Sequence, residues 1–460
     1  MNSKNRMNEK NHETTASFPH IDRSTSYTSS PDQMTVVLGA DVAEGYRIEW
    51  KTEDDEQRAR PHRSRTYDFT SMVLGLETPQ QLGERLAAQI ITMLDTAGKK
   101  PSRIACDLYP KFPTTYAAEV LSEHYDVPMI RMQKCHREIL DAAEAGRHVL
   151  GICLDDLSYG SDGTLWGGEV LDIREDRFTR LASIHPYQLI GTNMEIHGST
   201  PWQTAVSMLY DLARISHNED EAIRDFVAKQ EASEKVHLLD LCSLNDARAQ
   251  YIAQDRNKNT TRSTAASGLF DAVAAMLGFQ RVSTPTGRTS MEALAEAAEV
   301  FGLKCEKRKN EISALYRKLE KLISAAEEMD DPTLEPGDLW EDTDDGAFSE
   351  EAADDNQDIL HTEQLIQLLA DERIRYLSAY GKRNYDRPLN LKKPDTGDSD
   401  ENSQMLAWFF LDALATILRS YCEEKKAKEG YDGIPIVLAG HFLKSEITRN
   451  HLEAKIMLSE

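Results

Sequence analysis

The chain has 460 residues, which is enough for two or three domains with a large core and excludes a peptide-sized binder. Acidic residues outnumber basic ones by 78 to 53, and the formal net charge of −25 repels nucleic-acid phosphates and anionic membranes. The six cysteines are scattered without a CxxC pair, as in a cytoplasmic protein with reduced thiols. We therefore expect a cytoplasmic protein that does not bind nucleic acid and is neither a disulfide scaffold nor a zinc ribbon.

Neither end of the sequence reads as a membrane segment. Residues 1–33 are rich in Asn, Ser, Thr, Lys and His and lack the apolar core of a signal peptide, so we expect a disordered tail. The most apolar segment near the other end, Met405 to Leu418, is interrupted by Asp412 and is shorter than the ~20 residues that a membrane helix needs. These observations predict a soluble protein with no membrane partner.

Strands and helices are predicted to alternate after the tail. Thr35 to Val42 reads as a strand that runs into a glycine turn at Gly39, and Tyr46 to Trp50 alternates like its hairpin partner. Pro79 to Ala97 places its apolar residues on one face of a helix and leads to a strand over Ser102 to Leu108. This order predicts a layered α/β structure.

A second strand and hairpin lie farther along the chain. The apolar run from His148 to Leu154 has the length of a strand and leads to the carboxylate of Asp155, which suits a metal ion or a polarised water. In the hairpin over 154–169, several glycines permit the close backbone approach that a phosphate needs. From spacing alone, an ordinary tight turn at Ser161-Asp162-Gly163 is the favoured interpretation. The two hairpins, near 35 and near 149, indicate a duplicated fold.

The character of the sequence changes between 301 and 404. An amphipathic helix is predicted from the spacing of its apolar residues, which are Ile312, Leu315, Tyr316, Leu319, Leu322 and Ile323. The stretch from Glu327 to Asp358 then holds fifteen acidic residues and no Lys or Arg. Such a tract repels itself, so we expect a solvated, disordered insertion; a docking site for a basic protein is the alternative.

Four segments, taken in order, resemble one known family. They are Cys106-Asp107-Leu108-Tyr109-Pro110, Met132-Gln133-Lys134-Cys135-His136-Arg137-Glu138, Leu154 to Glu169, and Leu269-Phe270-Asp271-Ala272-Val273-Ala274-Ala275-Met276-Leu277-Gly278. This order is similar to the carbamoyl-transferring domain of the hydrogenase maturation carbamoyltransferase family, HypF. The resemblance spans roughly Met34 to Val300, and Pro435 to Ile447 resembles the family's late strand and glycine turn.

The resemblance implies a two-lobed, actin-like ATPase fold of the α/β class, with nucleotide between the lobes. On this basis we expect a disordered tail at 1–33, a first lobe at 34–148, a second lobe at 149–300, a helical insertion with the acidic tract at 301–404, and a C-terminal part of the fold at 405–460 that is truncated relative to the family.

The resemblance also implies an activity. In the family, a carbamoyl adenylate made elsewhere in the same long chain reaches this domain. The carbamoyl group then passes to the C-terminal cysteine of a partner enzyme, which makes the cyanide ligands of nickel-iron hydrogenase. ATP or carbamoyl adenylate is therefore the expected cofactor, and a hydrogenase maturation enzyme is the expected partner.

Positions within the matching motifs give the expected site residues. Asp155 and Asp271 are the expected catalytic residues, and Asp155 is also the expected metal ligand. The expected nucleotide-binding residues are Gly39, Asp162, Gly163, Glu169, Thr264 and Gly440.

Departures from the family fall at positions that would hold ligands. Two histidines of the family, four residues apart on one helical face, match Lys134 and Glu138 here. A lysine and a glutamate at this spacing more readily form a surface ion pair, worth ~0.3–0.5 kcal/mol, than a metal site. Asp155 is kept, but Asp156 and Ser158 replace glycines beside it and hinder the approach of a phosphate. These changes weigh against a divalent metal ion at Asp155.

Three hypotheses remain open. The first is a HypF-like carbamoyltransferase domain with weakened or lost catalysis. The second is a non-catalytic scaffold, a pseudoenzyme that binds a partner protein through the same fold. The third is a relative of the tRNA threonylcarbamoyltransferases, which the strongly negative net charge disfavours.

Overall fold

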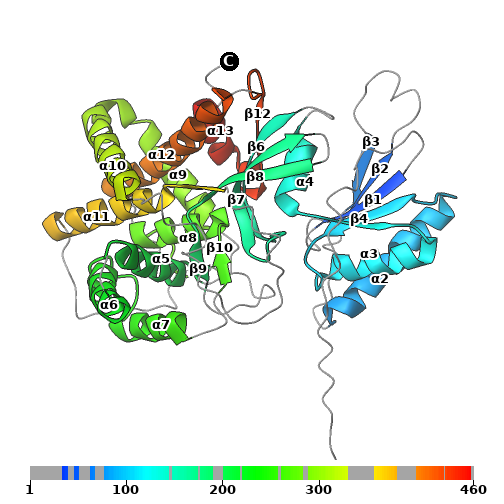
Figure 1. Ribbon diagram of the computed structural model, residues 1–460, viewed down its shortest axis with the longest axis horizontal. Helices are drawn as coiled ribbons and strands as arrows, with labels where there is room; N and C mark the ends of the chain where they lie inside the picture. Colours follow the sequence, from blue (N-terminus) through cyan, green and yellow to red (C-terminus); the bar gives the residue numbers. More distant parts are fainter. Residues whose placement is uncertain are drawn as a thin grey trace, which may run out of the picture.

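The computed structural model contains two α/β units joined by a helix (Figure 1). The residues that the structure describes are 34–39, 46–50, 63–67, 77–143, 148–174, 177–189, 200–217, 220–256, 261–282, 289–329, 357–380, 400–428 and 430–456. The predicted tail and most of the predicted acidic tract lie outside these ranges, so both stay predictions.

The first unit is a five-stranded sheet with two helices. Its elements are β1 (Met34–Leu38), β2 (Tyr46–Trp50), β3 (Arg63–Tyr67), α2 (Pro79–Thr96), β4 (Arg103–Asp107), α3 (Pro113–Tyr125) and β5 (Met129–Met132). The strand order is β3-β2-β1-β4-β5, antiparallel from β3 to β1 and parallel from β1 to β5. The predicted hairpin, helix and strand of this region are thereby confirmed. Thr78 caps the start of α2, because its side chain accepts a hydrogen bond from the backbone of Gln81.

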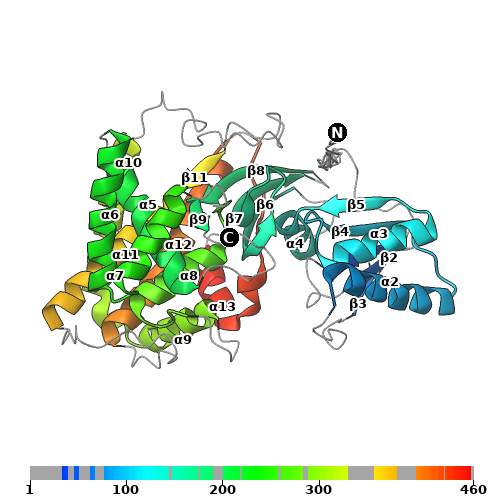
Figure 2. The ribbon, with the colours of Figure 1, turned by 90° about the horizontal axis from the view of Figure 1, so that it is seen from below.

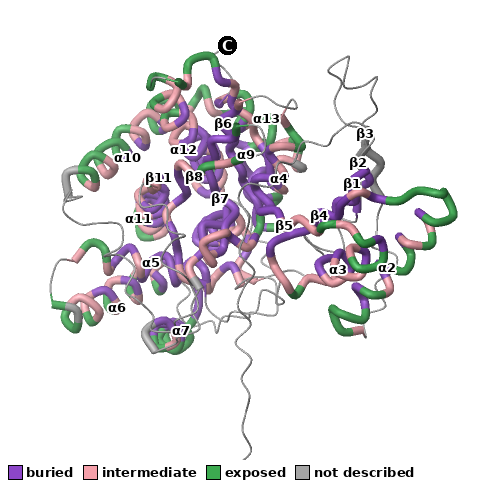
Figure 3. The backbone as a smooth tube through the Cα atoms, turned by 45° about the vertical axis from the view of Figure 1, so that its right-hand side comes forward, coloured by how far each residue is buried: buried purple, intermediate pink, exposed green. Residues whose placement is uncertain are grey.

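The second unit is built on a longer sheet. Its strands are β6 (Val149–Tyr159), β7 (Leu165–Arg174), β8 (Arg177–Ile184), β9 (Tyr187–Leu189), β10 (Thr261–Ser263), β11 (Asp358–Leu360) and β12 (Ile436–Ala439). Strands β8, β7 and β6 are antiparallel, and β12 adds parallel to β6. The order β8-β7-β6-β12 repeats the order β3-β2-β1-β4 of the first sheet, which is the duplication that the two hairpins indicated. Figure 3 shows that β6 and β7 are buried along most of their length.

Helices gather on one side of this second sheet (Figures 1 and 2). They are α5 (Pro201–Ile215), α6 (Glu221–Leu238), α7 (Leu244–Arg256), α8 (Ala266–Leu277), α9 (Ser290–Gly302), α10 (Lys309–Met329), α11 (Thr362–Tyr380), α12 (Glu401–Lys426) and α13 (Glu446–Ile456), with short 3-10 helices at Cys305–Arg308 and His441–Lys444. Phe270 of α8 lies at the centre of their core, with its ring 5.0 Å from that of Phe410 and 4.6 Å from that of Phe442.

Helices α10 and α11 fall within the predicted insertion at 301–404, yet they pack into the same core. Leu315 of α10 and Leu365 of α11 are buried in the hydrophobic cluster that also contains the helix-facing residues of β6. The hydroxyl of Tyr316 in α10 donates a hydrogen bond to Asp412 of α12. The described helices of this stretch therefore belong to the second unit by packing, whereas the exact domain boundaries stay predictions.

Among the described helices, α12 alone is long and apolar enough to cross a membrane by length and composition. It extends beyond the predicted 405–418 segment at both ends, and 67% of its most apolar stretch is buried inside the protein. Asp412 in its middle is buried and accepts a hydrogen bond from the ammonium of Lys455 at 3.1 Å. This burial is that of a core helix.

The helix α4 (Lys134–Ala142) lies between the two sheets (Figure 2). In the first sheet, Val36 and Leu38 face α2 and α3, whereas Val37 points to the opposite face. There it joins a small cluster to which Leu140 of α4 adds its side chain. This alternation follows from the two-residue period of a strand, and it places α4 on the face that α2 and α3 leave open.

The second sheet meets α4 in the same way. Residues Leu150, Ile152 and Leu154 of β6 face the helical core, whereas the intervening residues Val149 and Cys153 face α4. Gly151 lies between these last two residues, where a β-carbon would clash with the side chain of Ile139 on α4. The missing side chain of Gly151 therefore permits the close approach of α4 to β6.

We expect Gly151→Ala to destabilise the chain by about 1–3 kcal/mol, because the added methyl overpacks the contact with Ile139. Urea unfolding followed by circular dichroism measures the change. Gly302→Ala is the matched control, because the nearest atoms to its β-carbon would be 3.8 Å away. Equal stability of the two variants would show that α4 does not depend on this close contact.

Candidate functional site

The site is centred on a bulge in β6. The pairing of β6 with β7 shifts register between Leu154 and Ser158, so that three residues of β6 oppose Gly167 of β7. A β-carbon at Gly167 would lie only 2.7 Å from the carbonyl oxygen of Asp155, and φ at this glycine is +152°. The bulge directs the side chain of Asp155 into the protein, where it is fully buried.

The Asp155 carboxylate is contacted by three segments of the chain. Its Oδ1 accepts hydrogen bonds from the backbone nitrogens of Asp156 at 2.8 Å and His441 at 3.2 Å. Its Oδ2 lies 3.0 Å from Nζ of Lys134 in α4, whose side chain is also buried. Gly440 lets the chain after β12 reach this point, because φ there is +112° and a β-carbon would clash with the Leu154 carbonyl.

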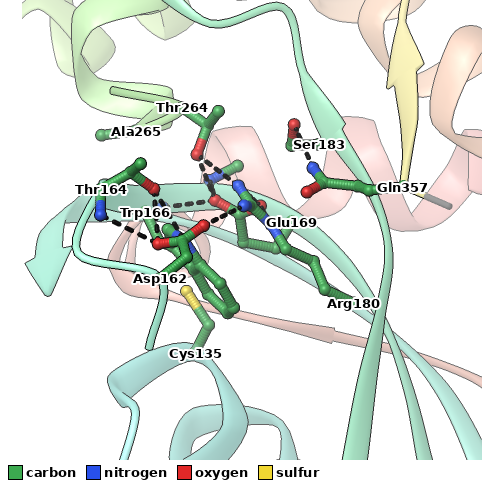
Figure 4. A network of polar contacts seen from close by, with 12 residues as sticks. Cys135, Asp162, Thr164, Trp166, Glu169, Arg180, Ser183, Thr264, Ala265 and Gln357 are labelled. Carbon is green, nitrogen blue, oxygen red and sulfur yellow. Dashed lines mark hydrogen bonds and ion pairs between the residues drawn. The ribbon is translucent and has the colours of Figure 1, made fainter. Parts of the chain in front are cut away.

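A second polar cluster surrounds Arg180 of β8 (Figure 4). The guanidinium donates hydrogen bonds to Asp162 at 2.9 Å, to Glu169 at 2.9 Å and to the hydroxyl of Thr264 at 3.1 Å. It also lies over the ring of Trp166, 4.1 Å from the ring centroid, a favourable cation–π distance. Two carboxylates thus share one guanidinium whose side chain is only 9% exposed.

Glu169 and Thr264 join the hairpin to the segment before α8. Glu169 is fully buried, and its Oε1 accepts hydrogen bonds from the backbone nitrogen of Gly167 at 2.9 Å and from the hydroxyl of Thr264. The backbone nitrogen of Thr264 donates to the Leu165 carbonyl at 2.8 Å. A β-carbon at Gly168 would lie 2.5 Å from the Thr264 carbonyl, so a glycine is needed for this approach.

Asp162 shapes the turn of the hairpin. Its Oδ1 accepts hydrogen bonds from the backbone nitrogen of Thr164 at 2.9 Å and from Nε1 of Trp166 at 3.0 Å. Gly163 has φ of +81°, a conformation that favours glycine. The predicted tight turn is therefore confirmed, and Asp162 stabilises it.

Asp271 lies in α8 and accepts a hydrogen bond from the hydroxyl of Ser290 at the start of α9. Burial of the carboxyl raises its pKa from 3.8 to about 7; the Ser290 hydrogen bond opposes this rise, and the negative charge of Asp156 adds to it. The electrostatic effect of Asp156 connects Asp271 with the bulge beside Asp155.

Gly39 follows β1 in the first unit. The preceding residue, Leu38, accepts a hydrogen bond through its carbonyl from Arg137 of α4 at 3.3 Å. Since Arg137 lies three residues after Lys134, the end of β1 and the Asp155 bulge contact the same turn of α4.

The structure brings most of the predicted site residues into two groups. Asp155 lies with the Gly440 segment at the bulge, whereas Asp162, Glu169 and Thr264 surround Arg180, with Gly163 in the turn beside Asp162. Gly39 lies at the end of β1, whose carbonyl at Leu38 contacts Arg137 of α4. Asp271 in α8 is close enough to the bulge for the charge of Asp156 to raise its pKa. Their roles in binding or catalysis stay predictions.

The expected surface location of Lys134 is wrong. The residue is buried because α4 lies between two sheets, and it pairs with Asp155 of β6. Glu138 contacts Arg137 on the same helix at 3.9 Å. The spacing rule for exposed helix pairs does not apply on a face that another element covers.

These residues do not fit a divalent metal ion. The Lys134 ammonium stands against the Asp155 oxygen that a metal would need. Within the described ranges, no group of three or more His, Cys, Asp or Glu side chains could hold a metal ion. A second cation beside Lys134 would be repelled, so we derive no chemistry through a metal here.

Sequence reasoning missed Arg180, because no motif or spacing marks it. One signal was available. Asp162 and Glu169 fall in a strand-turn-strand segment with a largely apolar inner face, and carboxylates in such surroundings require a nearby cation. That argument predicts a basic partner but not its position in β8.

The middle of the chain matches the model of a known protein family. A family model described as carbamoyltransferase, Kae1-like domain, second subdomain, matches residues 151–335. This range contains the bulge, the Arg180 cluster and α8.

Curated proteins that are similar to this chain in sequence are also named carbamoyltransferases. A carbamoyltransferase HypF homolog of Cupriavidus necator is 28% identical over 217 residues, which cover 46% of this chain and 50% of the relative. Carbamoyltransferase HypF of Rhodobacter capsulatus is 31% identical over 189 residues, which cover 39% of this chain and 22% of the relative. The matches thus span half or less of the length of these relatives.

Solved structures show the fold. A crystal structure of full-length HypF in the phosphate- and nucleotide-bound form superposes with a TM-score of 0.60 at 16% identity, covering 94% of this chain and 52% of that chain. HypF of T. kodakarensis gives a TM-score of 0.56 at 15% identity, covering 93% and 44%. These comparisons support a Kae1-like, actin-like α/β fold for this chain and a HypF-like carbamoyltransferase domain in its matched part, residues 151–335.

Proposed function

We propose that this chain is a HypF-like carbamoyltransferase domain that acts in nickel-iron hydrogenase maturation with weakened or lost catalysis. The observation that carries the proposal is the state of Asp155. The acidic residue of the family is present, buried and hydrogen-bonded, yet the ammonium of Lys134 neutralises it at 3.0 Å. The site thus keeps its buried aspartate, but this carboxylate is already paired with a lysine.

The proposed ligand is ATP or carbamoyl adenylate. The guanidinium of Arg180 and the hydroxyl of Thr264 would hold a phosphate group, since both are hydrogen-bond donors of the kind that phosphates need. In the described structure Arg180 already pairs with Asp162 and Glu169. A phosphate must therefore compete with two carboxylates, and we expect weak binding.

The proposed partner is a hydrogenase maturation enzyme whose cysteine thiol accepts the carbamoyl group. Asp271 is the proposed proton acceptor, because a carboxyl with a pKa of about 7 is half-ionised at neutral pH. The cytoplasm is the proposed location, and the six free cysteines of the chain support a reducing compartment.

One observation favours the alternative of a non-catalytic scaffold. Each central carboxylate already has a cationic partner inside the fold: Asp155 pairs with Lys134, and Asp162 and Glu169 share Arg180. A cation that is already paired in this way has less to gain from an anionic ligand. In that case the fold would present its surface to a partner protein, and a basic protein at the acidic tract is the remaining candidate.

Nucleotide binding tests the first proposal. We expect ATP at millimolar concentration to raise the melting temperature of the full chain by a few degrees, since ligand at 100 times its Kd adds about 2.7 kcal/mol of stability. Thr264→Val should abolish most of this rise, because it removes the hydroxyl beside Arg180. Differential scanning fluorimetry measures both, each variant being compared with its own ligand-free state.

The matched control is Lys321→Ala on the exposed face of α10, which should respond to ATP like the wild type. Carbamoyl transfer to the partner thiol should be at least ~100-fold slower than with a full-length HypF, in line with the loss of a group that stabilises the transition state. No melting shift with ATP or carbamoyl adenylate would favour the scaffold instead.

The pKa of Asp271 gives a pH-dependent prediction. Its native pKa of about 7 exceeds the value of 3.8 for an unperturbed aspartate, so its stabilising contribution is complete below pH ~4 and is lost as pH rises towards 7. Asp271→Asn does not titrate. We therefore expect the stability of this variant relative to the wild type to improve between pH 5 and pH 8, by up to roughly 2.5 kcal/mol.

Urea unfolding at the two pH values measures the change. Ser290→Ala is the matched control, because it removes the hydrogen bond that opposes the raised pKa and should preserve the pH dependence. A stability difference between wild type and Asp271→Asn that is constant over this range would mean that Asp271 ionises normally.

A further inference from the structure

A lysine faces the buried carboxylate at the centre of this site. We propose that the ammonium of Lys134 is a built-in cation that takes the place of a divalent metal ion at Asp155, so that the site is complete without metal. That this position corresponds to a metal site rests on the proposed function. The contacts that support the inference are all between described residues.

The Lys134 ammonium occupies the place beside Asp155 that a metal ion would need. Nζ of Lys134 lies 3.0 Å from Oδ2 of Asp155, while Oδ1 is occupied by the backbone nitrogens of Asp156 and His441. Oδ2 makes no hydrogen bond of good geometry within the described structure, so charge rather than a directed hydrogen bond compensates it. An ammonium binds a carboxylate oxygen in this way without any further ligand.

The position of Lys134 is fixed by its own helix. It is the first residue of α4, and the preceding Gln133 caps the helix by accepting a hydrogen bond from the backbone of His136 at 2.9 Å. The Gln133 amide also donates to the hydroxyl of Ser158 at 3.1 Å, on the same strand as Asp155. The start of α4 is thus bound to β6 at two neighbouring points, and the lysine has a defined place.

The second negative charge near this position is Glu138. The charges of Asp155 and Glu138 both act on the buried thiol of Cys153, whose pKa is raised mainly by burial and by its contact with Cys135. Glu138 is 20% exposed and has the guanidinium of Arg137 as a partner at 3.9 Å, so Asp155 is the buried carboxylate that depends on the charge of Lys134.

Removal of this charge is the first test. Lys134→Met keeps the length of the side chain and leaves Asp155 buried without its cation. We expect the melting temperature of the metal-free full chain to fall by roughly 10 °C, the scale of an unpaired buried charge. Lys111→Met, at an exposed position of the first unit, is the matched control and should melt like the wild type.

The double variant Lys134→Met with Asp155→Asn removes both charges and should recover most of the loss. Mn²⁺ should partly restore the melting temperature of Lys134→Met and should leave that of the wild type unchanged. If Lys134→Met melts like the wild type, or if the double variant is no more stable than the single one, the ammonium is not compensating Asp155 and the inference fails.

Gain of a metal site is the second test. Lys134→His with Glu138→His places two imidazoles four residues apart on α4, facing Asp155, which is a ligand set that Zn²⁺ accepts. We expect this variant to retain close to one equivalent of Zn²⁺ after dialysis, measured by atomic absorption. Adding Asp155→Asn should remove the metal, which separates this position from zinc bound elsewhere.

Two results would overturn the inference. One is a wild-type chain that retains stoichiometric divalent metal which Asp155→Asn removes. The other is a histidine variant that takes up no Asp155-dependent zinc, since the position would then not be that of a cation. All these measurements are made without nucleotide, so a failure of ATP binding or carbamoyl transfer would refute the proposed function and leave this result intact.

Discussion

The ion pair between Lys134 and Asp155 is the interaction on which the rest of the site depends. Two charges taken out of water are tolerated only where each compensates the other. Lys134 comes from the first turn of α4, and Asp155 comes from the bulge of β6. The backbone of His441 adds the chain after β12 to the same carboxylate. Three segments that are distant or separate in the sequence therefore meet at one carboxylate, and this ion pair adds to the packing of Ile139 against Gly151 that holds α4 on the second sheet.

Much of the fold could be predicted from the sequence, because strands and helices leave local periods of 2 and 3.6 residues. The strand at β6, its hairpin and the helix α2 were found in this way. Contacts between distant segments leave no such period. Arg180 was missed for this reason, and the burial of Lys134 could not be inferred because α4 reads as a surface helix when the two sheets that cover it are unknown.

Composition also says little about packing. The acidic character after 301 predicts an insertion, which stays a prediction, but composition describes the surface of a segment and not its buried face. The apolar residues of α10 and α11 point into the core of the second unit, where Leu315 and Leu365 are buried. Tyr316 and Lys455 then satisfy the carboxylate of Asp412 inside the apolar helix α12. The same helices that carry surface charge thus complete the core behind the sheet.

The helix α4 belongs to two cores at once. Leu140 packs with residues of the first sheet and also with the cluster between α4 and the second sheet. Lys134 lies six residues earlier on the same helix, which is about 9 Å along its axis. The helix that supplies the ammonium to Asp155 is thus the same helix through which the first sheet contacts the second unit, so a substitution at Leu140 alters the packing on both of its sides.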